Sequence, residues 1–413
     1  MRTGDQASTT TTGAGAPHRL PVGTLALLSA AVAAAVSTEV MPVGLLPQLA
    51  DAFAVPEDRI GWWMSAYALV VALGAVPVTA LVAHRSPRGV LVALLLVYAA
   101  ANGLVVVAGT TGGYPLALTA RLLGGLAHAG LFSVAVATAV AVSPPGRSGR
   151  AVALVNTGIT LALALGVPLG SAAGTAWGWR WTFAATTGAL LLLAAAAAVL
   201  VPARAPGTGP GLPGPRTGEH PRRGGSGVLA ALRGRRLLLV ALTTAVLTLG
   251  HYSAYTYVTP LLLRAGVGEG SVSLALLGYG LASFAGLLLA GATADRHPLA
   301  ALRAVVAVVA ACLFALALGS GHAAATVAAV VVWGAAFGAL PSLLQTAALR
   351  ATDVPGAAPA VVNSMFNVGI AAGAWVGGRV LLGGGPVPLA LTGAALAVTA
   401  LVVASRLGSA PAR

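Results

Sequence analysis

Two ionisable side chains stand inside long apolar runs, the carboxyl group of Glu39 and the guanidinium group of Arg121. A charged side chain costs about 2.5–3.5 kcal/mol at the centre of a membrane-spanning helix, so we expect both groups to face the protein interior. A carboxyl group placed there can take up and release a proton, and a guanidinium group beside it can change its affinity for that proton. The pair is therefore the first candidate for proton chemistry.

The positions of these two residues predict similar depths in a membrane. Glu39 precedes Gln48, the expected end of its helix, by nine residues, or roughly 13 Å at 1.5 Å per residue. Arg121 follows Tyr114, the expected start of its helix, by seven residues, or roughly 10 Å. We hypothesise that both groups face one central cavity and interact there. A structural ion pair, or an arginine that bonds backbone carbonyls, would also account for them.

Apolar runs make up most of the chain and must position these groups. Charged residues are 8% of the 413 residues, against about 25% in soluble proteins. Twelve runs are long enough to cross a bilayer as helices. They lie near 21–47, 60–83, 89–109, 114–141, 151–173, 181–201, 237–262, 271–294, 299–319, 323–348, 358–382 and 387–405. We therefore predict an all-α integral membrane protein with twelve transmembrane helices in two pseudo-symmetric bundles of six.

Two short motifs, which recur at nearly the same offset, support the division into two bundles. Residues 83–87 match 294–298, 211 positions later, and residues 155–157 match 362–364, 207 positions later. Duplicated halves are typical of secondary transporters, which bind substrate between the halves near the membrane midplane. The predicted domains are a disordered cytoplasmic tail (1–19), an N-terminal bundle (20–201), a cytoplasmic linker (202–236), a C-terminal bundle (237–405) and a cytoplasmic tail (406–413).

The arginine distribution predicts the orientation in a cell membrane. If the N-terminus is cytoplasmic, most of the 23 basic residues fall in cytoplasmic segments, as membrane proteins prefer. Both termini are then cytoplasmic, and richness in Arg, Ala and Gly is typical of a bacterial source. The net charge of +14 does not indicate a nucleic-acid partner, because the arginines are scattered and form no basic face. We expect the bilayer as partner and a monomeric chain.

The sequence argues against an enzyme. It contains no H-E-x-x-H motif, no cluster of metal-ligand residues and no G-x-S-x-G motif. We therefore expect no metal and no cofactor. A substrate sensor built on a transporter would normally add a soluble signalling domain, and the two tails are short. The lone cysteine, Cys312, can form no disulfide within the chain.

Five motifs between residues 20 and 405 resemble the major facilitator superfamily, specifically its twelve-span drug:proton antiporters in the arabinose-efflux-permease-like and chloramphenicol-exporter-like group. The stretch TEVMPVGLLPQLADAFAV at 38–55 is similar to that group's first helix. The remaining four are an R-x-x-x-G motif at Arg121 and Gly125, YTYVTPLL at 255–262, a helix-5 motif at Gly158, Gly166, Pro168, Gly170 and Gly174, and the two loops 80–88 and 291–296. The first loop has His84 where the family has an acid, whereas the second keeps the acid as Asp295.

The resemblance implies a proton-coupled exporter of small organic compounds, in which helices 1, 4, 7 and 10 line the cavity. An importer or facilitator of a sugar or metabolite is the alternative. The implied proton-coupling residues are Glu39, Arg121 and His128. The implied substrate-cavity residues are Glu39, Arg121, His251, Tyr252, Tyr255, Trp333, Phe337 and Asn363. The implied cytoplasmic gate is formed by Arg85, Arg88, Asp295 and Arg296.

Each of these assignments has a simpler alternative. His128 lies seven residues after Arg121 on a similar helix face and could relay protons, or it could be a packed histidine. The aromatic residues could be ordinary helix packing, and the gate residues could be loop charges that set topology. The glycines of helix 5 would allow close helix contact, and Pro168 would bend that helix by removing one backbone bond.

Overall fold

The computed structural model describes residues 20–82, 85–111, 113–144, 147–203, 233–293, 297–319, 321–352 and 357–408. Within these ranges, eleven helices are long and apolar enough to cross a membrane, and α3 covers the remaining predicted span. The first half contains α1 (Val22–Gly44), α2 (Leu46–Phe53), α3 (Glu57–Val82), α4 (Pro87–Thr111), α5 (Tyr114–Ala141), α6 (Ser148–Leu161), the π-helical turn η1 (Ala162–Gly166), α7 (Val167–Trp177) and α8 (Trp179–Leu200). The second contains α10 (Arg235–Tyr255), α11 (Val258–Arg264), α12 (Glu269–Thr293), α13 (Pro298–Leu318), α14 (Ala323–Leu349), α15 (Ala357–Gly384) and α16 (Pro386–Ser405). The predicted all-α membrane fold is confirmed.

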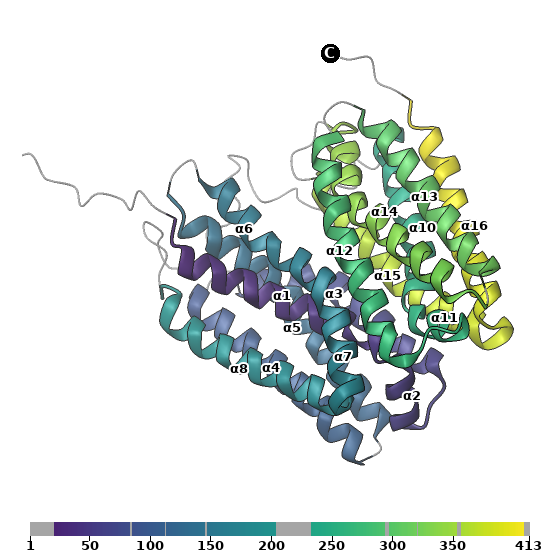
Figure 1. Ribbon diagram of the computed structural model, residues 1–413. Helices are drawn as coiled ribbons and strands as arrows, with labels where there is room; N and C mark the ends of the chain where they lie inside the picture. Colours follow the sequence, from purple (N-terminus) through teal and green to yellow (C-terminus); the bar gives the residue numbers. More distant parts are fainter. Residues whose placement is uncertain are drawn as a thin grey trace, which may run out of the picture.

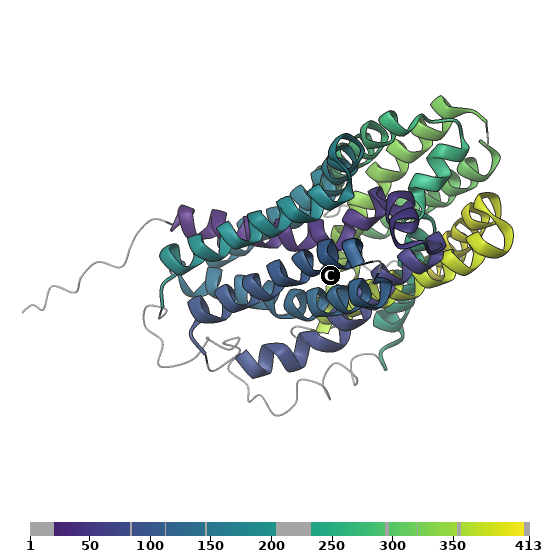
Figure 2. The same cartoon turned by 90° about the horizontal axis from the view of Figure 1, so that it is seen from below.

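The helices form two groups that follow the halves of the sequence (Figure 1). Figure 2 views the molecule from below and shows the purple-to-teal helices beside the green-to-yellow ones. Helix α3 packs on α15, and η1 and α7 pack on α12, and these are the main contacts between the halves. The domain boundaries stay a prediction, since residues 1–19 and most of the linker lie outside the described ranges.

The two halves meet at one end of the molecule, which we call the α2 end. There the Thr259 hydroxyl of α11 donates to the Val43 carbonyl of α1 at 2.9 Å, and Gly378 of α15 lies against Asp58 of α3. At the opposite end, where α8 ends and α10 begins, Leu81 of α3 and Leu288 of α12 are exposed. Figure 1 shows the two halves diverging toward this second end, which we call the linker end.

Prolines explain where the first span is interrupted. A proline has no N–H, so it leaves the carbonyl four residues earlier without its helical partner. Pro42 leaves the Thr38 carbonyl without its helical partner, and Pro47 does the same to the Val43 carbonyl. The helix is interrupted at Leu45, between α1 and α2. The predicted first span, 21–47, is thus two helices. The seventh predicted span is divided in the same way, between α10 and α11.

A line of glycines lets α6 and α7 lie against α1. A Cβ added at Gly158 would lie 2.2 Å from the Ser29 carbonyl oxygen, and one at Gly166 would lie 3.0 Å from the Ser37 Cα. Gly170 faces Met41, and Gly174 faces Leu45 in the same way. We call these four glycines the α1 seam. Pro168 is the second residue of α7, just after the π-helical turn, and the Ala164 carbonyl four residues earlier faces Gly280 of the other half.

Replacing Gly158 with Ala is expected to lower the free energy of unfolding by about 1–3 kcal/mol, because the new methyl group would overlap a backbone oxygen that cannot move alone. The measurement is thermal unfolding of the purified protein in detergent. Gly188→Ala on α8 is the control, because nothing lies within 4 Å of its added Cβ. An equal melting temperature for the two variants would contradict the close contact with α1.

Candidate functional site

Five side chains from four helices of the first half form a polar cluster, which we call the Glu39 cluster. Glu39 comes from α1, Tyr67 from α3, Tyr98 from α4, and Arg121 and His128 from α5. Glu39 is 9% exposed and Arg121 is 2% exposed, so both groups predicted to avoid lipid are inside the protein. The structure thus brings the three predicted proton-coupling residues together.

Arg121 bonds the backbone of α1. Its Nη1 donates to the Thr38 carbonyl at 3.0 Å, and its Nη2 donates to the Glu39 carbonyl at 3.3 Å. The Thr38 carbonyl is the one that Pro42 leaves without a helical partner, so the guanidinium supplies the missing donor. The guanidinium carbon also lies 4.6 Å from the ring centroid of Tyr67, a favourable cation–π distance.

The Glu39 carboxyl group lies beside the imidazole ring of His128. Its Oε2 lies 3.7 Å from the Nδ1 of His128, and no ion pair joins it to Arg121 in the part of the chain that the structure describes. The sequence left open whether Arg121 pairs with the carboxyl group or bonds backbone carbonyls, and the structure shows the second arrangement. The two charges still lie close together, because Arg121 holds the backbone of the residue that carries the carboxyl group.

Hydrogen bonds orient His128. Tyr98 donates its hydroxyl proton to the Ala35 carbonyl at 2.8 Å, and its oxygen also bonds the hydroxyl of Tyr67. Because each tyrosine has one hydroxyl proton, Tyr67 must donate to Tyr98. The 2.8 Å bond between Tyr67 and Nδ1 of His128 then requires that Nδ1 carries the proton. The Nδ1–H of His128 is thus donated to the Tyr67 hydroxyl oxygen, and the Glu39 carboxyl group lies 3.7 Å from the same nitrogen, too far for a hydrogen bond.

This network ends on a peptide carbonyl at Ala35, which can accept a hydrogen bond but cannot pass a proton onward. Its geometry suits positioning of His128 and Glu39 better than proton conduction through the two tyrosines. Proton exchange at this site would therefore take place at the Glu39 carboxyl group, whose side chain keeps 12% of its surface exposed.

The second half contributes rings, which form what we call the aromatic cluster. Its members are His251, Tyr252 and Tyr255 from α10, Tyr279 from α12, and Trp333 and Phe337 from α14. The rings of His251 and Phe337 are stacked, with centroids 3.3 Å apart, and Trp333 meets His251 edge-on at 5.0 Å. The predicted cavity aromatics are therefore close to one another, and in this structure they are packed rings.

Polar atoms inside the aromatic cluster have no partner. His251 is 0% exposed, and neither of its ring nitrogens has a hydrogen bond, nor does the indole nitrogen of Trp333. A buried polar group left unpaired costs about 1–3 kcal/mol. Tyr252 of this cluster lies within electrostatic range of Glu39, which connects the two clusters.

The remaining predicted residues are not drawn into either cluster. Asn363 is exposed on α15, and its carbonyl accepts a bond from the Asn367 amide. Arg88 donates to the Val201 carbonyl at the end of α8, within its own half, and Arg85 is exposed. Asp295 and Arg296 lie outside the described residues, so the gate stays a prediction. Among the described residues, no group of three or more His, Cys, Asp or Glu could hold a metal ion.

Sequence reasoning missed Tyr67, Tyr98 and Tyr279. The internal repeat was a usable signal for two of them, because Tyr279 follows Tyr67 by 212 positions, close to the repeat offset of the loops. Both tyrosines lie against a glycine of a neighbouring helix. Tyr67 lies against Gly125 of α5, and Tyr279 lies against Gly334 of α14. Nothing in the sequence marks Tyr98, which stands in an apolar run.

Thr259 was also missed, and it leads to a prediction about the contact between the halves. Thr259→Val removes the inter-half hydrogen bond to the Val43 carbonyl, so the α2 end should open more often, by roughly fivefold for one hydrogen bond. The measurement is the distance distribution between spin labels at Asp51→Cys and Arg264→Cys in a Cys312→Ser background. Thr175→Val, which loses a bond inside its own helix, is the control. An unchanged distribution would contradict this role.

Comparison with known proteins gives a consistent answer. The family model described as Major Facilitator Superfamily matches residues 26–374. A chloramphenicol resistance protein of Streptomyces lividans is 36% identical over 92% of this chain and 94% of its own length. An uncharacterised transporter of the same superfamily from Bacillus subtilis is 31% identical over the same shares.

Solved structures share the fold at low identity. An inward-facing, occupied bacterial homologue of the human lysosomal transporter Spinster superposes with a TM-score of 0.68 at 14% identity, covering 95% of this chain and 99% of that one. The fucose:proton symporter of E. coli superposes with a TM-score of 0.62 at 18% identity, covering 95% and 100%.

Proposed function

This chain belongs to the Major Facilitator Superfamily and is a multi-pass membrane transporter, and we propose that it exports small organic compounds in exchange for protons. Chloramphenicol is the first compound to test, because the relative from Streptomyces lividans carries that resistance in its name. We place the chain in a bacterial cell membrane, as a monomer with both termini in the cytoplasm and without a cofactor.

The observation that supports proton coupling best is the placement of Glu39 on α1. The carboxyl group is buried beside the imidazole ring of His128, in a turn whose backbone carbonyl accepts a hydrogen bond from Arg121. One turn later, the Val43 carbonyl of the same helix accepts the inter-half bond from Thr259. A movement of the halves that breaks this bond therefore acts on the helix that carries the carboxyl group, which is how proton binding and opening can be linked.

The direction of transport follows from the proposed orientation. If the arginine distribution places the linker end in the cytoplasm, the halves diverge toward the cytoplasm in this structure and are closed toward the outside. Substrate would then bind from the cytoplasm, and opening of the α2 end would release it outside while Glu39 takes up a proton. Return to the present state would deliver that proton to the cytoplasm.

The aromatic cluster suggests the substrate class. Stacked rings with unpaired nitrogens on His251 and Trp333 suit an aromatic compound that carries its own hydrogen-bonding groups. Such a compound could separate the rings and bond the nitrogens, which would offset the cost of leaving them unpaired. The nearby carboxyl group of Glu39 would then sense whether the compound is bound.

The function is tested by expressing the chain in a bacterial strain that lacks its own major exporters. We expect resistance to chloramphenicol that an uncoupler abolishes. Inverted membrane vesicles with an acidic interior should accumulate the compound, and dissipating the pH gradient should release it. Uptake of a sugar into whole cells, with no accumulation of any antibiotic in inverted vesicles, would instead support an importer.

A further inference from the structure

Two polar atoms in the first half are buried without a partner, and their chemistry is complementary. The Nε–H of Arg121 is a hydrogen-bond donor, and the side-chain oxygen of Asn102 on α4 is an acceptor. Each of the two residues is 2% exposed, so both groups lie inside the protein. The proposed function uses the other two nitrogens of Arg121 and makes no use of Asn102.

The unused atom of the Asn102 amide is its oxygen, because the nitrogen already has a partner. Nδ2 donates to the Tyr98 carbonyl, one turn earlier on α4, at 2.9 Å. A reversed amide would place two oxygens against each other, so the orientation is fixed. The Tyr98 carbonyl lies inside α4, where it also accepts the backbone N–H of Asn102. The amide therefore does little for this helix, and its oxygen remains free for a donor on another one.

Asn102 and Arg121 lie at the same depth, one turn beyond Tyr98 toward the α2 end. The Tyr98 ring lies against Gly124 of the antiparallel neighbour α5, 3.2 Å from an added Cβ. Asn102 follows Tyr98 by four residues. Arg121 precedes Gly124 by three on the helix that runs the opposite way, so both lie roughly 5 Å further along. Helix α1 agrees, because Tyr98 bonds the Ala35 carbonyl and Arg121 bonds carbonyls one turn later.

Arg121 holds a segment of α1 that opening of the α2 end would disturb. It bonds the Thr38 carbonyl, which Pro42 leaves without a helical partner. Five residues after Thr38, the Val43 carbonyl accepts the bond from Thr259 of the other half. An opening that shifts this segment would break the bonds of Arg121 to α1. A guanidinium group inside the bundle then needs another acceptor, because burying an unpaired charge is costly.

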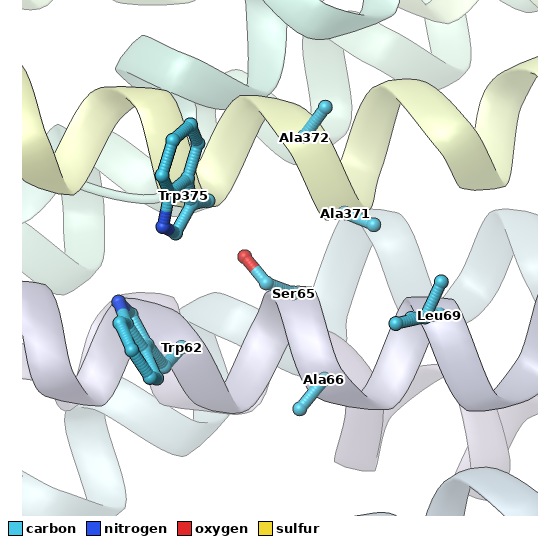
Figure 3. Close-up of a pocket in the computed structure, with 7 residues that line it drawn as sticks. All are labelled: Trp62, Ser65, Ala66, Leu69, Ala371, Ala372 and Trp375. Atoms are coloured by element: carbon cyan, nitrogen blue, oxygen red, sulfur yellow. The ribbon is translucent and has the colours of Figure 1, made fainter.

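Helix α3 leaves room for a movement of the halves beside the Glu39 cluster. A groove lies between Ser65 and Leu69 of α3 and Ala371 and Trp375 of α15 (Figure 3). Tyr67, which stands two residues from both Ser65 and Leu69, is on nearly the opposite face of α3, where its ring meets Arg121. The groove and the cluster are thus on different sides of this helix, so α15 can shift along α3 without entering the cluster.

We propose that Asn102 is a positioning residue, which receives Arg121 when the α2 end opens. The guanidinium group exchanges the two α1 carbonyls for the Asn102 oxygen, which accepts from Nε–H, and the turn that carries Glu39 is released. Because this oxygen is unpaired in the present state and paired in the open one, it favours opening. The inference rests on the opening that the proposed function requires, and it adds the residue that holds Arg121 in the second state.

The distance distribution between spin labels at Asp51→Cys and Arg264→Cys, in the Cys312→Ser background, measures the opening and needs no substrate. Asn102→Leu removes the acceptor at similar volume and should lower the open fraction roughly fivefold, the effect of one hydrogen bond. Its melting temperature should be equal or higher, because the lost oxygen has no partner in the closed state. Asn102→Asp provides a charged acceptor for the guanidinium group, so it should raise the open fraction instead.

Thr138→Val is the matched control, because the Thr138 hydroxyl is buried on α5 and bonds a carbonyl of its own helix, so its loss should not change the distances. A lower melting temperature of Asn102→Leu with unchanged distances would show that the amide only supports the fold, and would overturn the proposal. So would shifts of the Leu and Asp variants in the same direction. If no variant and not even the unmodified chain shows a second distance, the opening itself is absent, and the proposed function fails as well.

Discussion

Replacing Glu39 with Gln is expected to abolish transport driven by a pH gradient while leaving the protein folded and inserted. The amide keeps the size and the hydrogen-bonding atoms of the side chain but cannot exchange a proton. One proton moving through 100 mV provides about 2.3 kcal/mol, enough to hold roughly a 50-fold concentration ratio of an uncharged substrate. Without the exchange, the accumulation ratio should fall to about one, the value at equilibrium with no driving force.

The measurement is accumulation of substrate in inverted vesicles with and without a pH gradient. Glu269→Gln is the control, because Glu269 is an exposed carboxyl group at the start of α12 and should behave as the unmodified chain. Substrate exchange between equal concentrations needs no net proton movement, so Glu39→Gln should keep it, which shows that the variant is intact. Full accumulation of substrate by Glu39→Gln would contradict the proposal that Glu39 couples transport to protons.

Replacing Arg121 has the second largest expected effect, because its guanidinium serves two carbonyls of α1 at once. Arg121→Ala would leave the Thr38 carbonyl without a partner, since Pro42 cannot supply one, and we expect the free energy of unfolding to fall by about 2–4 kcal/mol. Arg121→Lys keeps the charge but not the planar fork that reaches two oxygens. It should keep most of the stability and lose at least tenfold in gradient-driven transport, because a 1 Å displacement of the coupling group can cost that much.

Arg303→Lys is the matched control for Arg121→Lys. Arg303 also bonds backbone carbonyls, those of Ala404, Ser405 and Leu407 at the end of α16, but it is far from Glu39 in the other half. Its replacement should lower the melting temperature without changing the dependence of transport on the gradient. Equal transport by the two lysine variants would show that the geometry at Arg121 matters for folding alone.

Much of the fold could be predicted from the sequence, because helices that cross a membrane need long apolar runs and these are easy to recognise. The predicted span 114–141 coincides with α5, and 323–348 differs from α14 by one residue. The breaks after α1 and α10 were not predicted, since an apolar run does not show where its backbone bonds are interrupted. Pro42 and Pro47 were visible, but the partners of the freed carbonyls lie on other helices.

The candidate site was only partly predictable for a similar reason. Charges inside apolar runs stand out, so Glu39 and Arg121 could be singled out, and their shared depth could be estimated from helix length. The sequence could not decide whether Arg121 bonds the carboxylate or the backbone, because that depends on distances between α1 and α5. Tyr67 and Tyr98 are apolar in most of their surface and look like ordinary core residues until His128 is seen beside them.

The most direct test of proton coupling at Glu39 is to measure protons released when substrate binds. The purified chain in weakly buffered detergent, with a pH indicator, is mixed with a compound that it has been shown to export. If substrate and proton compete through Glu39, the unmodified chain should release up to about one proton per molecule, and Glu39→Gln should bind the compound and release none. Equal proton release by the two proteins would contradict the account.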